Sequence, residues 1–142
     1  MTGDDTWIVF GGGLDPTGGI ENAIDGRLVG PGGEFQTVGS TTSDMKGQAG
    51  YVIATASDFF YSLGGDNAGP TNNGVSAEMC FPGKSGCQGL GLPKLKNWNA
   101  LGTGTLLEGR YLSGSAQESS VIFAIGGDDG TGATVTTEFT NY

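Results

Sequence analysis

Residues 59–66 read Phe-Phe-Tyr-Ser-Leu-Gly-Gly-Asp, an apolar run that ends in a glycine pair and enters a polar turn. The same order occurs in residues 7–12, where Trp-Ile-Val-Phe precedes Gly-Gly, and in residues 121–128, where Val-Ile-Phe-Ala-Ile precedes Gly-Gly-Asp. The glycine pairs begin at positions 11, 64 and 126, so they lie 53 and then 62 residues apart. Repetition on this scale indicates stacked supersecondary units.

A shift of 62 positions superposes the second copy of this motif on the third. Six residues of the second copy then fall on identical residues of the third: Gly47, Ala54, Ser57, Gly64, Gly65 and Asp66. We therefore predict a single β domain over residues 1–142, built from about two and a half units. The approximate bounds of these units are 1–46, 47–108 and 109–142, and the first and third units are incomplete.

A strand-like segment with one glutamate follows each glycine pair. These glutamates are Glu21, Glu78 and Glu138. We expect them to make structural hydrogen bonds to neighbouring strands.

The composition favours an all-β protein. Glycine supplies 29 of the 142 residues, and 36% of the residues are hydrophobic. Glycine at this density, without a Gly-x-y period and with many Thr, Ser and Asn residues, is typical of antiparallel strands joined by tight turns. Aromatic residues make up 9% of the chain and cluster with β-branched residues, which argues against a disordered chain.

Alternation and turn residues predict the positions of the strands. The expected strands are 7–10, 20–24, 27–29 and 34–38 in the first unit, 50–56, 59–63 and 75–81 in the second, and 110–116, 120–125 and 134–139 in the third. In residues 92–110 an apolar side chain recurs at every third position from Leu92 to Leu101. A short helix and a strand followed by a loop remain alternatives there.

The net charge of −9 excludes some classes of partner. Binding to nucleic acid or to an anionic membrane draws on clustered Lys and Arg, so we expect neither. No run of eighteen apolar residues occurs, and residues 1–5 lack the features of a signal peptide. Lys84, Lys94 and Lys96 lie close together, which indicates either a solvated loop or contact with an acidic patch on a neighbouring copy.

The two cysteines, Cys80 and Cys87, bracket the turn-rich segment Phe-Pro-Gly-Lys-Ser-Gly. Such a short loop can bring the two sulfur atoms within bridging distance. A disulfide and a pair of ordinary thiols remain alternatives, because a reducing cytosol would keep both thiols reduced. The chain has no histidine, so a structural zinc site lacks ligands.

The ordered motifs resemble a kelch-type β-propeller repeat. The residues that carry the resemblance are Gly11, Gly12, Gly64, Gly65, Glu78, Trp98, Arg110, Gly126, Gly127 and Glu138. The resemblance implies antiparallel, glycine-rich sheets like propeller blades and a structural role for these residues. About two and a half units cannot close a ring, since propellers have four to eight blades. A single β-sandwich or barrel is therefore the alternative.

The sequence argues against catalysis. Without histidine, Ser-His-Asp and Cys-His arrangements are excluded. The Gly-Lys-Ser at residues 83–85 lacks the first glycine of a phosphate-binding loop, because Glu78 stands in its place. Neighbouring aspartates such as Asp128 and Asp129 point to opposite faces of an extended chain. Turns at Asp66–Asn67 and Asp128–Asp129 lack the spacing of a calcium loop. We predict no catalytic residue, cofactor or metal.

Exposed aromatic residues suggest a second line of function. Trp98 and Tyr142 are the better candidates to be exposed and to stack on sugar rings, whereas Trp7 and Tyr61 lie within apolar runs and are expected in the core.

The first functional hypothesis is a non-enzymatic structural or assembly protein on a virion, such as a phage tail or a capsid decoration, or on an extracellular fibre. Its partners would be copies of itself, bound through sheet edges, or other structural proteins. The alternative is an adhesin- or lectin-like module that binds a glycan or a protein. A weaker hypothesis is a hydrolase that uses paired carboxylates. Both leading hypotheses place the chain on a virion or an extracellular surface.

Overall fold

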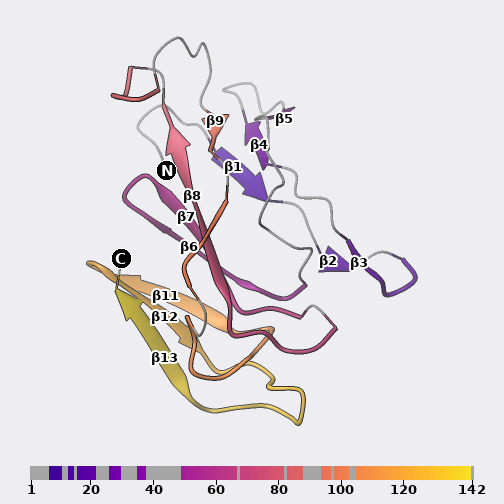
Figure 1. The fold of residues 1–142 in the computed structure, drawn as a ribbon. Helices are drawn as coiled ribbons and strands as arrows, with labels where there is room; N and C mark the ends of the chain where they lie inside the picture. The colour runs from indigo at the N-terminus through magenta and orange to yellow at the C-terminus, as the bar shows by residue number, and fades with distance from the viewer. Residues whose placement is uncertain are drawn as a thin grey trace.

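The fold is all-β and antiparallel, which confirms the predicted fold class. The structure is a computed structural model (Figure 1). It describes residues 7–10, 13–14, 16–21, 26–29, 35–37, 49–66, 68–81, 83–87, 94–96, 98–102 and 105–141. Within these ranges there is no helix, and no sheet closes into a barrel.

The first unit forms two small sheets. One has the strand order β1-β4-β5, and the other pairs β2 with β3. The strands are β1 (Trp7–Phe10), β2 (Gly13–Leu14), β3 (Ile20–Glu21), β4 (Gly26–Val29) and β5 (Phe35–Thr37). The parts of the expected first-unit strands at 22–24, 34 and 38 lie outside the described residues.

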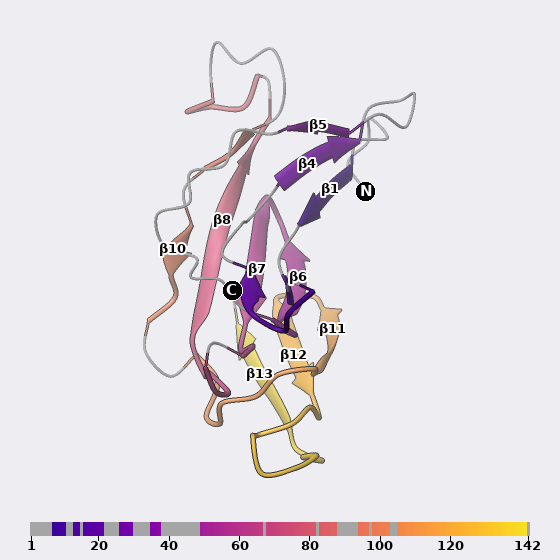
Figure 2. The same ribbon diagram turned by 90° about the vertical axis from the view of Figure 1, so that its right-hand side faces the viewer.

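The second unit forms the largest sheet, with the order β10-β8-β7-β6, and β9 also pairs with β8 (Figures 1 and 2). Its strands are β6 (Val52–Ala56), β7 (Phe59–Leu63), β8 (Gly74–Cys80), β9 (Lys94–Leu95) and β10 (Asn99–Ala100). Two short strands therefore occupy the described part of residues 92–110, in place of a helix. Lys94 belongs to a strand and not to a loop, because Lys94 pairs with Cys80.

The third unit forms a three-stranded sheet in the order β11-β12-β13. Its strands are β11 (Gly114–Glu118), β12 (Val121–Ile125) and β13 (Thr137–Asn141). In Figures 1 and 2 this sheet lies at the opposite end of the molecule from β1 and β4.

All three strands of the third unit begin later than predicted, and β12 does so by a single residue. The strand expected at 110–116 begins at Gly114, because Leu112 has a positive φ of 55° that interrupts an extended chain. The strand expected at 134–139 begins at Thr137, because the Thr134 N–H donates to the Gly127 carbonyl, 2.8 Å away, and this bond belongs to the loop.

The second and third units share one backbone plan. A shift of 62 positions carries β6 onto β11 and β7 onto β12 without any change of bounds. Ser57 and Ser119, which this shift superposes, have φ values of 50° and 51° in the hairpin turns. Gly64 and Gly126 have φ values of 67° and 62°. Glycine is suited to both positions because L side chains rarely adopt such a backbone conformation.

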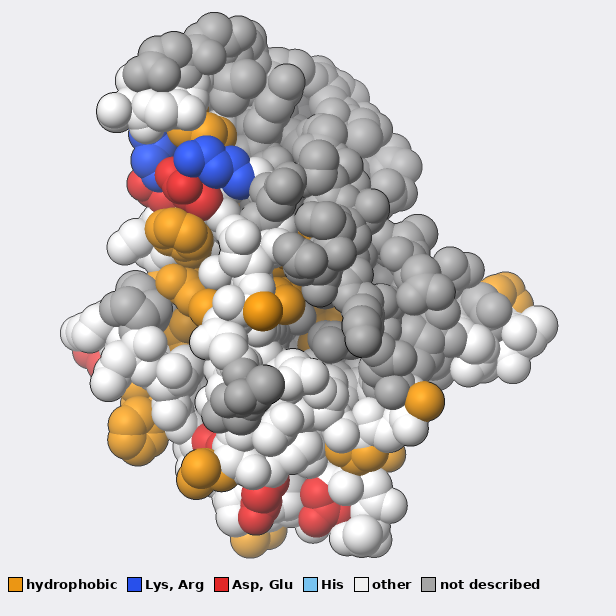
Figure 3. Space-filling model, in the orientation of Figure 1, with side chains coloured by type: hydrophobic (Ala, Val, Ile, Leu, Met, Phe, Trp, Pro, Cys, Tyr) orange, Lys and Arg blue, Asp and Glu red, His pale blue; other side chains and the backbone are white. Residues whose placement is uncertain are grey.

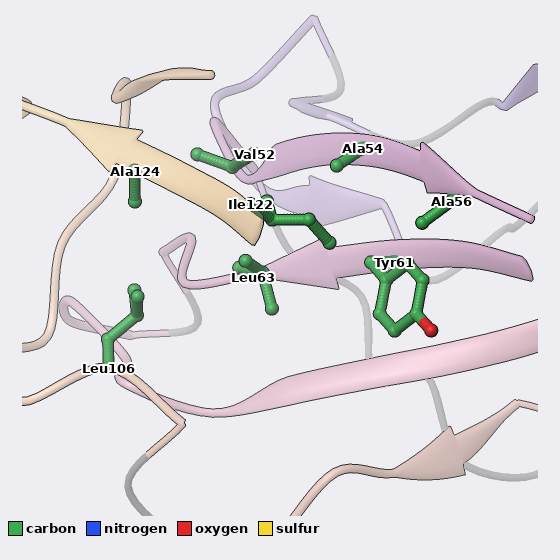
Figure 4. Packing of buried hydrophobic residues seen from close by; sticks show 8 residues of the cluster. All are labelled: Val52, Ala54, Ala56, Tyr61, Leu63, Leu106, Ile122 and Ala124. Atoms are coloured by element: carbon green, nitrogen blue, oxygen red, sulfur yellow. The ribbon is translucent and has the colours of Figure 1, made fainter. Parts of the chain in front are cut away.

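The main core lies between these two units. It contains Val52, Ala54, Ala56, Tyr61, Leu63, Leu106, Ile122 and Ala124. Figure 4 shows Ile122 of β12 directed toward the side chains of β6 and β7. A second cluster, Val75, Ala77 and Trp98, packs on the other face of the second sheet with Tyr51 and Phe60 at its margin. The buried side chains alternate along β6, as expected for a strand with one covered face.

Candidate functional site

The most ordered polar cluster lies at the junction of the second and third units, around Arg110. The Arg110 side chain is only 1% exposed. Its Nη1 donates to the carbonyls of Gly126 and Thr136, each at 3.1 Å, and its Nη2 donates to Thr136 Oγ1 at 2.9 Å. The Arg110 Nη2 also pairs with Glu138 Oε1. Arg110 thus ties the glycine pair of the third unit to the start of β13.

Glu138 completes this cluster from β13. Its carboxylate accepts hydrogen bonds from the backbone N–H groups of Leu107 and Glu108, in addition to the pair with Arg110. The Glu138 side chain is 10% exposed. The Glu138 carboxylate therefore joins the segment before β11 to β13 through one ion pair and two backbone donors.

Glu78 has different surroundings in the second unit. Its Oε1 and Oε2 accept hydrogen bonds from Lys84 and Lys96, each at 2.8 Å, and Lys84 also pairs with Asp58 at 2.9 Å. These charged side chains gather at one end of the second sheet, at the upper left of Figure 3. The hydrogen bonds from Lys84 and Lys96 lower the pKa of Glu78 from its ordinary value of 4.5. Hydrogen bonds to Glu78 and Asp58 raise the pKa of Lys84.

Glu78 and Glu138 therefore do not occupy equivalent positions. Glu78 pairs in register with Phe59, whereas Glu138 pairs with Ala124. Side chains alternate between faces, so Glu78 shares a face with Tyr61 and Glu138 lies on the opposite face of its own sheet. Neither Glu78 nor Glu138 makes the expected hydrogen bonds to a neighbouring strand. Glu78 binds two lysine side chains, and Glu138 binds groups in the segment between β10 and β11. The Glu21 side chain lies outside the described residues.

The glycine pairs allow the chain to approach closely at the unit junction. A Cβ atom added to Gly64 would lie 2.5 Å from the Arg110 carbonyl oxygen. The neighbouring Gly65 N–H donates to the same oxygen at 2.7 Å. The second glycine pair is thus part of the contact between units. Nothing is described for Gly11 and Gly12, which lie outside the described residues.

A disulfide joins Cys80 and Cys87, with 5.4 Å between the two Cα atoms. It closes the loop that carries Lys84, and the Cys87 N–H donates to the Lys84 carbonyl at 2.9 Å. Lys84 therefore stands on a constrained loop, next to its two carboxylate partners.

Trp98 corrects one expectation. This side chain is 2% exposed and packs against Val75 and Ala77, so it cannot stack on a sugar at the surface. The short strands on either side of Trp98, β9 and β10, both pair with β8 and so place Trp98 against the second sheet. The residues next to Trp98 in the sequence do not indicate this packing, because the sheet is formed by residues distant in the sequence. Tyr61 is buried, as predicted for an aromatic residue within an apolar run. Tyr142 lies outside the described residues, as does the side chain of Trp7.

The aspartates of the acidic turns accept hydrogen bonds from backbone N–H groups of the same turns. Asp66 Oδ1 accepts from the Gly69 N–H and Asp128 Oδ1 from the Gly130 N–H, each at 2.7 Å. Asp129 Oδ1 accepts from the hydroxyl and the N–H of Thr131, and the hydroxyl bond chiefly lowers the pKa of Asp129. The contacts of Asp128 and Asp129 with the residues two positions on are Asx turns. Across the described ranges, no group of three or more His, Cys, Asp or Glu residues is arranged to hold a metal ion.

The third sheet exposes an apolar surface on the side away from the second unit. Phe139 of β13 is 67% exposed, and Ile125 of β12 is 45% exposed. Phe139 pairs in register with Phe123, and the two ring centroids lie 6.2 Å apart. Burial predictions from the sequence did not single out this surface. The signal was present in the 62-residue shift, which superposes Ile125 on the buried Leu63.

No protein-family model matches the chain, and no curated protein matches its sequence. The part of the chain that the structure describes contains no helix of the length and apolar character needed to cross a membrane.

Proposed function

We propose that this chain is a non-enzymatic structural or assembly protein that associates with copies of itself through the borders of its sheets. The observation that carries the proposal is the position of β13. It is the last strand in the order β11-β12-β13, and no described strand pairs with its other side. The opposite border of this sheet, β11, is in contact with the second unit, because the Ser115 hydroxyl donates to the Ile53 carbonyl of β6 at 3.1 Å.

The sequence of β13 supports this role. An edge strand presents unpaired N–H and C=O groups, and proteins usually protect such strands with Lys, Pro or an inward-pointing charge. The strand Thr137–Asn141 contains neither Lys nor Pro. Its only charge is that of Glu138, which points inward but is already paired with the buried Arg110, so a strand added to β13 would not leave it unpaired. Another chain can therefore add a strand along β13 through backbone hydrogen bonds.

The polar clusters support a structural role and not a catalytic one. Arg110 and Glu138 bind each other and the backbone, and Asp128 and Asp129 cap their own turns. Paired carboxylates for hydrolysis need free oxygen atoms that face a common substrate. The proposal extends to a virion or an extracellular surface, because disulfides such as Cys80–Cys87 persist in oxidising surroundings.

The molar mass of the full chain in solution tests the proposal. Static light scattering across a concentration series is expected to give a mass that rises from 14.4 kDa to a multiple of it. A Cys80→Ser/Cys87→Ser variant is the control for disulfides between chains, and it is expected to associate as well. A constant mass of 14.4 kDa at every concentration would contradict the proposal.

Binding of a glycan is the competing function, and Trp98, one of the aromatic residues expected to serve it, is buried. A glycan array probed with the fluorescently labelled full chain separates the two functions. We expect no selective signal. Selective, saturable binding by a chain that stays monomeric would replace the assembly function with an adhesin- or lectin-like one.

A further inference from the structure

The exposed side of the third sheet is the repeat equivalent of a buried interface. We call it the outer face and define it by Ala116, Phe123, Ile125 and Phe139, which cross-strand pairing places together. The 62-residue shift superposes the first three on Ala54, Tyr61 and Leu63. Those residues are only 8%, 8% and 1% exposed, because the third unit covers them.

The covering contact inside the chain has a simple pattern. Ile122 and Ala124 of β12, which stand four and two positions before the third glycine pair, are 0% and 1% exposed against the second sheet. Figure 4 shows both side chains on the side of β12 that faces β6 and β7. A strand with apolar residues at these two positions therefore covers this face of the repeat.

A backbone hydrogen bond accompanies the contact. The Gly65 N–H of the second unit donates to the Arg110 carbonyl at 2.7 Å, where the third unit begins. The corresponding donor in the third unit is the Gly127 N–H. Among the described residues it has no acceptor. The third unit thus repeats both the apolar face and the donor, without the element that covers them.

The first unit supplies the matching pattern. The residues four and two positions before its glycine pair are Trp7 and Val9, both apolar, and they belong to β1. In Figures 1 and 2, β1 lies far from the third sheet of the same molecule. Within the described structure, β1 therefore does not cover the outer face of its own molecule.

We propose that the outer face binds the first-unit strand of a second copy of this chain and so continues the interface seen between the second and third units. This inference rests on the proposed self-association and names the surface that carries it. The contact joins two different surfaces, so each copy can bind one neighbour at each end. Such contacts form rings if they close and filaments if they do not.

Ile125→Glu tests the outer face without touching the edge strand, because Ile125 lies on the central strand β12. Leu112→Glu is the matched control, since Leu112 is 71% exposed, precedes β11 and lies outside the outer face. A charge buried in an apolar contact is costly. We expect Ile125→Glu to raise the concentration needed for association by about tenfold or more, and Leu112→Glu to leave it unchanged. Circular dichroism verifies that both variants keep their strands.

Mixing two variants tests the second surface. Ile125→Glu copies keep the first-unit strand, and Val9→Glu copies keep the outer face. Each variant alone is expected to stay at 14.4 kDa, whereas an equimolar mixture forms a one-to-one complex. A mixture of folded variants that remains monomeric would overturn the assignment of the strand.

The outcomes separate this inference from the proposed function. If Ile125→Glu associates as well as the unchanged chain, the outer face is wrong and association through β13 alone stands. If the unchanged chain is monomeric at every concentration, both fail.

Discussion

The second and third units have the same hairpin, yet their equivalent side chains differ in exposure. Leu63 is 1% exposed and its counterpart Ile125 is 45% exposed, although the two strands have identical bounds after the 62-residue shift. The difference comes from what lies beside each sheet, because the third unit covers the second and no described element covers the third. The local sequence determines where each strand forms, whereas the neighbouring unit determines which of its side chains are buried.

The largest expected difference between the units concerns their glutamates. Glu138→Ala leaves the buried Arg110 with only the exposed Glu108 carboxylate, 3.4 Å from its Nη2, and loss of one partner of a buried pair costs about 3–5 kcal/mol. Glu78→Ala removes contacts of partly exposed lysines, so its effect is expected to be much smaller. Urea denaturation measures both free energies of unfolding. Equal losses would show that the two glutamates have equivalent roles.

The next comparison uses the superposed aliphatic residues. Leu63→Ala creates a cavity in the main core and is expected to lower the free energy of unfolding by about 3 kcal/mol. Ile125→Ala at the exposed counterpart is expected to change it by less than about 0.5 kcal/mol in the monomer. Thermal denaturation at low concentration measures these values. A comparable loss at Ile125 would mean that the outer face is already covered within one molecule.

The disulfide gives the second unit a constraint that the described third unit lacks. Replacing both cysteines by serine frees the loop between Cys80 and Cys87 in the unfolded chain. For so short a loop we expect a loss of about 2 kcal/mol. Thermal denaturation measures this loss, and the original chain under reducing conditions provides the control. An unchanged midpoint of unfolding would show that the loop is held by its other contacts.

The smallest expected effect is on the pH dependence. The pKa of Glu78 is lowered in the folded state by Lys84 and Lys96, so this contribution to stability is present above pH 4.5 and is lost as the pH falls through the folded pKa. The pKa of Lys84 is raised, so its contribution is present below pH 10.5 and is lost as the pH rises through the folded pKa.

Glu78→Gln is expected to flatten the acid side of the stability profile. Stability measured from pH 2 to pH 7 in the two chains tests this expectation. Profiles that stay parallel over the whole acid range would exclude Glu78 as a source of the acid dependence.

Much of the local structure could be predicted from the sequence, since the glycine pairs and apolar runs are local signals. They located β6, β7 and β12, and the second and third glycine pairs have positive φ values. The fold class followed from the same signals. Trp98 could not be assigned correctly, because its burial depends on a sheet that is distant in the sequence.

Register accounts for the error at the glutamates. Gly74 pairs with Leu63, eleven residues earlier, whereas Thr137 pairs with Ile125, twelve residues earlier. The loop between β12 and β13 is therefore one residue longer than the loop between β7 and β8. A shift of one residue moves a side chain to the other face of the sheet. The residue types at matching positions therefore do not show that Glu138 binds Arg110 whereas Glu78 binds two lysines.

Amide hydrogen exchange measured at low and high protein concentration tests most directly whether a second copy completes the third unit. We expect the Gly127 N–H and the amides of β13 to gain protection as the concentration rises, while the amides within the β6–β7 pair stay unchanged. Protection of β13 that is the same at every concentration would contradict self-association through the third sheet, because that sheet would then need no partner.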